Sequence, residues 1–203
     1  MNDTTSVITP TWAMGLLTFV EEAETEPVTE TELRQHIRVE ENIETDYLMR
    51  LARTGRHVIE RMTNRSWAEQ VLGIECNVAR PILPLPLSAP FQKFEAVQWL
   101  DAAGARTEID PALYYVDYGT IPMSIDLTAA PAANRYLVHY RAGDQAGPPA
   151  PDDIRHAILI MARWAYQHPD GMMPETKYKT SGGNVPLMVQ TLCNPYLFDT
   201  KGW

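Results

Sequence analysis

The side chains that most often carry catalysis or bind metal ions are few and dispersed in this chain. The five histidines have neither the i, i+4 spacing of a helical metal site nor a cysteine close by; they are His36, His57, His139, His156 and His168. Cys76 and Cys193 are far apart and form no C-x-x-C pair. We therefore predict no metal site and no disulfide framework, and a reducing compartment.

Three further sets of residues could do chemistry, and each also has a structural interpretation. Asp152–Asp153 could act as a general acid and base, but two acids also suit the first turn of a helix. Arg50, Arg53 and Arg56 could bind phosphate, or could form a solvated helix face paired with acidic neighbours. Six aromatic residues could stack on sugars or bases, or could pack in a core; they are Trp99, Tyr114, Tyr115, Tyr118, Tyr136 and Tyr140.

The sequence contains no phosphate-binding loop, dinucleotide fingerprint, nucleophile elbow or H-E-x-x-H helix. Since every candidate group has a structural explanation, we predict a protein with no catalytic residues and no cofactor. An enzyme would need several polar groups to converge in one pocket.

The chain is acidic, with 203 residues and a formal net charge of −9. Such a surface repels phosphate backbones, which argues against a nucleic-acid clamp. It is compatible with a channel wall along which DNA slides, although ordinary solubility is the simpler explanation. Residues 11–20 are mildly apolar but too short to span a membrane, and no basic residue precedes them, so we expect neither membrane insertion nor a signal peptide.

Two segments have the apolar spacing of amphipathic helices. In residues 29–63 we expect a short helix capped by Thr29 or Thr31 and a longer one that is capped by Asn42 and ends near Asn64. The polar face of the longer helix would carry the three arginines and Glu60. A second segment begins at Asp152 and ends before Pro169, with its own apolar stripe. The two stripes most simply bury against each other.

Between these helices the sequence predicts short strands. Runs at 69–78, 94–100, 114–116 and 136–140 alternate or carry aromatic and β-branched residues. The proline-rich run 81–87 is excluded from the centre of a sheet because each proline removes a hydrogen-bond donor. Residues 101–104 have the composition of a hairpin turn.

We therefore predict an α+β fold: a small helical bundle with an inserted antiparallel β-rich subdomain and extended terminal arms. The expected domains are an N-terminal arm (1–28), a bundle (29–65 and 150–169), a β-rich insertion (66–149), and a loop with a C-terminal tail (170–203).

The order of these features resembles the head-tail connector (adaptor) proteins of tailed phages, in their long form with a β insertion between helices. Residues 26–39 resemble the opening short helix of that family, and residues 46–67 resemble its long helix and following turn. Residues 83–100 resemble its proline-marked approach to the β part. Residues 114–116 and 138–143 resemble its later strands. Residues 151–166 resemble its C-terminal helix, and residues 185–196 resemble its closing segment. The likeness covers roughly residues 26–197; the acidic N-terminus and residues 171–183 depart from it.

The resemblance implies a ring, usually twelvefold, beneath the portal of a filled head. The ring extends the channel for double-stranded DNA, which it does not bind specifically, and joins the head to a stopper or tail protein. The particle could be a phage, a prophage or a gene transfer agent, with assembly in the bacterial cytoplasm. Apolar residues in the two terminal segments are the candidate contacts with neighbouring copies and the portal: Trp12, Leu16, Phe19, Leu187, Leu192, Tyr196, Phe198 and Trp203. We expect one or both segments to become ordered on assembly.

Two other functions remain open from the sequence. Another structural component of the same particle, such as a stopper or tail-completion protein, tends to be mostly β and to lack two flanking helical stripes. A non-catalytic carbohydrate- or peptide-binding module would expose a row of aromatic residues on one sheet face, and Trp99 and Tyr140 are the residues that test it.

Overall fold

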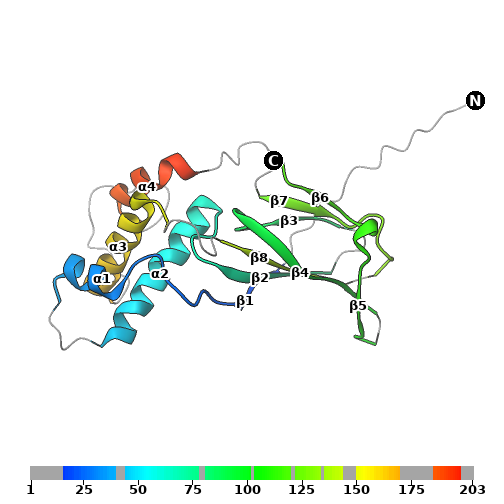
Figure 1. Cartoon of the computed structure of the whole chain (residues 1–203), viewed down its shortest axis with the longest axis horizontal. Coiled ribbons are helices and arrows are strands. Elements are labelled where there is room, and N and C mark those ends of the chain that lie inside the picture. Colours follow the sequence, from blue (N-terminus) through cyan, green and yellow to red (C-terminus); the bar gives the residue numbers. More distant parts are fainter. Residues whose placement is uncertain are drawn as a thin grey trace, which may run out of the picture. The chain divides into compact units, whose positions relative to one another are not determined.

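The computed structural model describes residues 16–39, 44–77, 81–101, 103–119, 122–133, 135–143, 150–169 and 185–197. These residues form helices and two antiparallel sheets, which confirms the predicted α+β class (Figure 1). The chain divides into two compact units. The β unit comprises Met1–Glu22 and Gln70–Ala142, and the helical unit comprises Ala23–Glu69 and Gly143–Trp203.

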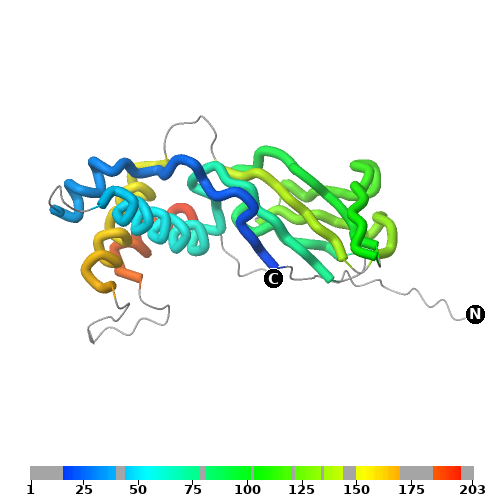
Figure 2. Tube along the Cα trace, turned by 90° about the horizontal axis from the view of Figure 1, so that it is seen from below, coloured from blue at the N-terminus to red at the C-terminus, as the bar shows by residue number. Residues whose placement is uncertain are grey.

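The helical unit is built from helices that are far apart in the sequence. They are α1 (Glu30–Ile37), α2 (Thr45–Thr63), α3 (Asp152–Gln167) and α4 (Leu187–Cys193), followed by the 3₁₀ turn η2 (Asn194–Tyr196). Helix α3 contacts the other three, and Figure 2 shows α1 and α2 beside it. Leu48, Ile59 and Ile158 lie in one buried cluster. The prediction that the two apolar stripes bury against each other is therefore confirmed.

Close contact between α2 and α3 depends on Gly55. A Cβ atom at this position would lie 3.1 Å from the Ile158 carbonyl oxygen and 3.1 Å from the Met161 Cβ. The missing side chain lets the two helices approach closely. This explains why a residue of poor helix propensity stands inside the apolar stripe.

For the two helices expected in residues 29–63, two of the three predicted ends are correct. Thr29 caps α1 in a capping box: its side chain accepts from the Glu32 N–H, and the Glu32 carboxylate accepts from the Thr29 N–H at 2.8 Å. Asn64 ends α2 in the left-handed conformation, with φ of 52°. The prediction that Asn42 caps α2 is wrong, because α2 begins at Thr45 and Glu44 occupies the cap position without a side-chain bond.

The β unit contains a five-stranded and a three-stranded sheet. The first has the order β1 (Leu16–Glu21), β2 (Gln70–Cys76), β8 (Arg135–Ala142), β4 (Phe91–Leu100) and β5 (Arg106–Glu108). The second has the order β3 (Ile82–Leu85), β7 (Met123–Asp126) and β6 (Tyr115–Asp117). The short 3₁₀ turn η1 (Pro111–Leu113) precedes β6. All these pairings are antiparallel, as the sequence predicted.

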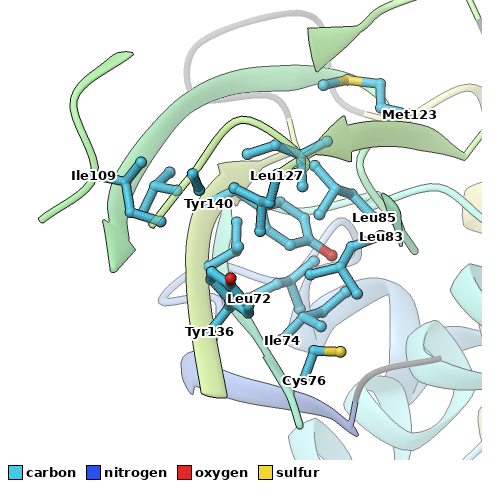
Figure 3. Packing of buried hydrophobic residues seen from close by; sticks show 14 of the residues in the cluster. Leu72, Ile74, Cys76, Leu83, Leu85, Ile109, Met123, Leu127, Tyr136 and Tyr140 are labelled. Carbon is cyan, nitrogen blue, oxygen red and sulfur yellow. The ribbon is translucent and has the colours of Figure 1, made fainter. Parts of the chain in front are cut away.

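The core of the β unit receives side chains from both sheets (Figure 3). Leu72 and Ile74 of β2 pack in the same cluster as Leu83 of β3. Tyr136 and Tyr140 of β8 are fully buried, yet their hydroxyls are satisfied. Tyr136 donates to the Pro131 carbonyl at 2.8 Å, and Tyr140 donates to the Pro86 carbonyl. Burial raises the pKa of Tyr140 well above its ordinary value, so this hydroxyl remains a donor.

Proline and turn residues in the sequence account for an edge strand and a hairpin turn. The proline-rich run forms β3, which is an edge strand and carries Pro84. This agrees with the prediction that the run does not lie at the centre of a sheet. The β4–β5 hairpin turns at residues 101–104: the Asp101 carboxylate accepts from the N–H groups of Ala103 and Ala105, both at 2.8 Å. Gly104 has a φ of 84°. The predicted turn is confirmed.

Strand β1 was not predicted. Its residues fall in the segment that the sequence assigned to an N-terminal arm without clear periodicity, but they pair with β2 from Leu16↔Glu75 to Glu21↔Val71. The apolar residues Leu16 and Val20 stand at exposed positions, so the sequence does not alternate although the burial does. A register shift between Phe19 and Glu21, a β-bulge, adds a further irregularity.

Candidate assembly interface

The predicted interface residues occupy two surfaces, one in each unit. Leu16 and Phe19 lie on β1 in the β unit, and Leu187, Leu192 and Tyr196 lie on α4 and η2 in the helical unit. The other three predicted residues, Trp12, Phe198 and Trp203, lie outside the described residues.

Strand β1 exposes apolar side chains although it belongs to a packed sheet. Leu16 is 71% exposed and Val20 is 45% exposed, whereas Leu17 and Phe19 pack against the core of the β unit. On the exposed face, Thr18 and Val20 cover Gly73, whose absent Cβ would lie 2.9 Å from the Thr18 Oγ1 and 3.0 Å from the Val20 Cγ2. Phe19 is thus mainly a core residue, while Val20, which the sequence did not single out, is exposed.

Helix α4 also has one buried and one exposed side. Val189 and Cys193 are fully buried, and burial raises the pKa of the Cys193 thiol to about 11. Leu187 is 71% exposed, and Met188 and Leu197, which the sequence did not single out, are also exposed. A single turn of α4 therefore both anchors the segment and presents apolar groups outward.

Two of the predicted contact residues on this segment serve mainly to hold it in place. Leu192 packs against the helical core, and the Tyr196 ring meets the Trp67 ring edge-to-face with centroids 5.3 Å apart. The Trp67 indole N–H in turn donates to the Thr63 hydroxyl at 2.9 Å, at the end of α2. Residues 187–197 are therefore part of the folded helical unit.

The prediction of a solvated arginine face on α2 is wrong for Arg56 and Glu60, which are fully buried. Arg56 Nε donates to Glu26 at 2.7 Å and its Nη1 donates to Glu60 at 2.9 Å. Burial by itself lowers the pKa of Arg56, but the hydrogen bonds and charges of the two carboxylates outweigh it and raise that pKa. The other Glu60 oxygen accepts from the Trp67 N–H at 2.8 Å. This cluster ties the segment before α1 to α2 and to the chain after it.

The three arginines do not form a phosphate grip. Arg53 pairs with Glu26 at 3.2 Å, so Glu26 serves both Arg53 and Arg56. The Arg50 guanidinium lies over the Tyr47 ring, 5.9 Å from its centroid. Arg56 is committed to carboxylates in the interior, which leaves no convergent cationic surface on this stretch of α2.

The aromatic residues are divided between core and surface. Tyr136 and Tyr140 are buried and Trp99 is partly buried, whereas Tyr115 and Tyr118 are 69% and 63% exposed. A binding module that uses Tyr140 in an exposed row is therefore contradicted. Four rings do touch in series at the surface of the β unit, in the order Tyr118, Phe91, Phe94 and Tyr114. Phe91, Phe94 and Tyr114 also pack on the core, which accounts for this series structurally.

His36 and His156 meet between α1 and α3, with ring centroids 5.5 Å apart. Burial lowers the pKa of His36, and the charges of His156 and Arg163 lower it further. Nearby, Arg155 of α3 pairs with Glu32 of α1 and with Asp152. Asp152 and Asp153 lie in the first turn of α3, in agreement with their structural interpretation. His57, His139 and His168 lie on α2, on β8 and just after α3.

Acid should weaken the link between α1 and α3. The Thr29 N–H bonded to the Glu32 carboxylate, and to a lesser degree Arg155, lower the pKa of Glu32 from 4.5. Because the folded state holds the charged form, this stabilisation is complete above pH 4.5 and is lost as the pH falls through the lowered value. Glu32→Gln keeps an acceptor for the cap and should flatten the acid decline in unfolding free energy, measured by urea denaturation from pH 3 to pH 7. An unchanged slope would rule out this carboxylate as a contributor.

Neither a metal centre nor a membrane span is found in the part of the chain that the structure describes. Among these residues no three His, Cys, Asp or Glu side chains are grouped so that they could hold a metal ion. The described helices are also too short or too polar to cross a bilayer.

Comparison with known proteins finds similarity at the level of structure alone. Neither a family model nor a curated protein matches the chain. A chain from a structure described as the neck of an empty GTA particle, computed with C6 symmetry, matches with a TM-score of 0.65 at 20% identity. The match covers 90% of this chain and 95% of that chain.

Two further structures give the same result. A chain of the virion of a native gene transfer agent (GTA) particle matches with a TM-score of 0.65 at 19% identity, over 90% of this chain and 95% of that one. A chain of the neck of a native GTA particle, computed with C12 symmetry, matches with a TM-score of 0.59 at 18% identity, over 90% and 94%. The chain therefore has the fold of chains found in gene transfer agent particles and their necks.

Proposed function

We propose that this chain is a head-to-tail connector of a phage-like particle and forms a ring beneath the portal that leads to the stopper or tail. The observation that carries the proposal is the match to neck chains over nearly the full length of both proteins. The sixfold and twelvefold symmetry of those neck structures supports a ring.

The two surfaces described above offer apolar groups for the contacts that a connector needs. A copy in a ring contacts its neighbours through two different patches, and the ring must also bind the portal. Strand β1 and helix α4 each expose large apolar side chains that a solitary soluble protein would tend to cover. The acidic net charge suits a channel through which DNA passes without specific binding.

Negative-stain electron microscopy tests the proposal directly. The purified chain is imaged alone and after mixing with portal protein and with portal-containing heads. We expect rings, or portals that carry an added ring. If the chain decorates tail structures but leaves portals bare, it is a stopper or tail-completion component instead. A chain that stays monomeric and binds neither would contradict the proposal.

Helix α4 offers a sharper test of portal attachment than deletion of the C-terminus. Deleting residues 186–203 would remove Val189 and Cys193 from the helical core, so a loss of attachment would reflect misfolding. The double substitution Leu187→Asp/Met188→Asp changes exposed side chains alone. We expect it to reduce attachment to heads by at least about tenfold in a pull-down, since it places charges in an apolar contact.

A control at a second exposed site separates this effect from a general response to charge. Leu113→Asp introduces a carboxylate at another exposed apolar position, in the β unit. It should leave portal attachment unchanged. Equal losses for both variants, or normal attachment of the α4 variant with an unchanged melting temperature, would exclude α4 as the docking surface.

A further inference from the structure

The edge strands of the two sheets differ in how they are protected against pairing with another strand. Natural sheets guard their edges with short strands, charged residues or proline. Strand β3 carries Pro84, β6 has 3 residues, and β5 has 3 residues that include Arg106 and Glu108. Three of the four edge strands in the described sheets are therefore protected against pairing with a further strand.

Strand β1 lacks these devices up to Phe19, after which its bulge gives the edge some protection. It has 6 residues, LLTFVE, with neither lysine nor proline, and its single charged residue is at the last position. Within the described residues it pairs on one side, with β2. Its exposed Leu16 and Val20 would flank the backbone of any strand that added to its outer side. A bulge follows Phe19, so the regular part of the strand is Leu16–Phe19.

We propose that β1 accepts a strand from residues 4–9 of a neighbouring copy, so that each subunit completes the sheet of the next. This inference rests on the proposed ring. Residues 4–9 read TTSVIT, in which five of six side chains are β-branched and none is charged, and Pro10 follows at once. Such a segment favours a strand and provides main-chain groups for the outer side of β1. Because donor segment and acceptor strand differ, the contact is head-to-tail, as a ring requires.

Cysteine cross-linking of mixed variants distinguishes exchange between copies from pairing within one copy. One variant carries Thr18→Cys on β1; the other carries a single cysteine in place of Thr5, Val7 or Thr9. Any disulfide that joins the two introduced thiols in a mixture must link different chains. Cys76 and Cys193 are buried and should contribute little background during brief oxidation.

In assembled rings we expect covalent dimers at least about tenfold above the level of either variant alone, because pairing raises the local thiol concentration. A chain that carries both introduced cysteines is oxidised in parallel. If it yields internally linked monomers while the mixtures give no dimers, each segment covers its own β1 and the proposal fails.

A charge substitution gives an independent readout. Leu16→Lys/Val20→Lys adds the edge charges that β1 lacks, at exposed positions, and should weaken ring association at least about tenfold in sedimentation. Tyr115→Lys places one such charge at an exposed position of β6 and should leave association unchanged. Normal rings from the β1 variant, without cross-links in the mixtures, would overturn strand exchange but not the connector function. Absence of rings from the unmodified chain, alone or with portal, would overturn both.

Discussion

Replacing Arg56 with methionine is expected to lower the free energy of unfolding by about 3–5 kcal/mol, the usual cost of removing one partner from a buried ion pair. Methionine fills much of the same space, so the loss is electrostatic. The Glu60 side chain is fully buried and that of Glu26 is 3% exposed, and both would face a hydrocarbon. Urea denaturation at neutral pH, followed by far-UV circular dichroism, measures the change.

The neighbouring Arg53 provides the control. It binds the same Glu26 at 3.2 Å, but its side chain is 43% exposed. Arg53→Met should therefore cost less than about 1 kcal/mol, as for other solvent-exposed ion pairs. Similar losses for the two variants would show that burial does not set the strength of this cluster. A stable Arg56→Met variant would show that the two carboxylates become protonated or hydrated at little cost.

Gly143→Ala should be the second strongly destabilising substitution, with a loss of about 2–4 kcal/mol from unfavourable backbone conformation and steric overlap together. Gly143 has a φ of 97°, and an added Cβ would lie 2.1 Å from the Ala68 carbonyl oxygen. The atoms that this Cβ would meet are backbone atoms of Ala68 and Glu69, in the same helical unit as Gly143, so no side-chain rotation relieves the overlap. The melting temperature and the urea midpoint should both fall.

Gly104 separates the two causes of that loss. Its φ of 84° is also left-handed, but a Cβ there would meet nothing within 4 Å. Gly104→Ala should thus show the conformational cost alone, about 1–2 kcal/mol. If Gly143→Ala were no worse than Gly104→Ala, the backbone around Ala68 must shift to accommodate the new methyl group.

Local patterns were sufficient to predict most elements of the fold. The capping box at Thr29, the end of α2 at Asn64 and the Asp101 turn each depend on residues close together in the chain, and all three are confirmed. The apolar stripes of α2 and α3 have a period that requires burial. Their pairing followed because each stripe is the simplest partner for the other.

Predictions failed where long-range contacts override local preference. Glu60 is polar and stands opposite the apolar stripe of α2, so its sequence context favours solvent. It is buried because Trp67 and, through Arg56, the distant Glu26 supply its partners. Strand β1 was missed because the apolar residues Leu16 and Val20 stand on its exposed face, which hides the alternation, and because it pairs with β2, 50 to 59 residues away.

By itself, the sequence determined the α+β class, the helix pairing and the terminal segments in which exposed apolar residues occur, since these depend on periodicity and composition. Tertiary structure alone decided which of those residues face outward. On α4, Leu187 is exposed while Val189, two positions later, is fully buried, and no local pattern distinguishes them. The difference arises because α3 covers one side of α4, and such packing between distant segments is fixed when the chain folds.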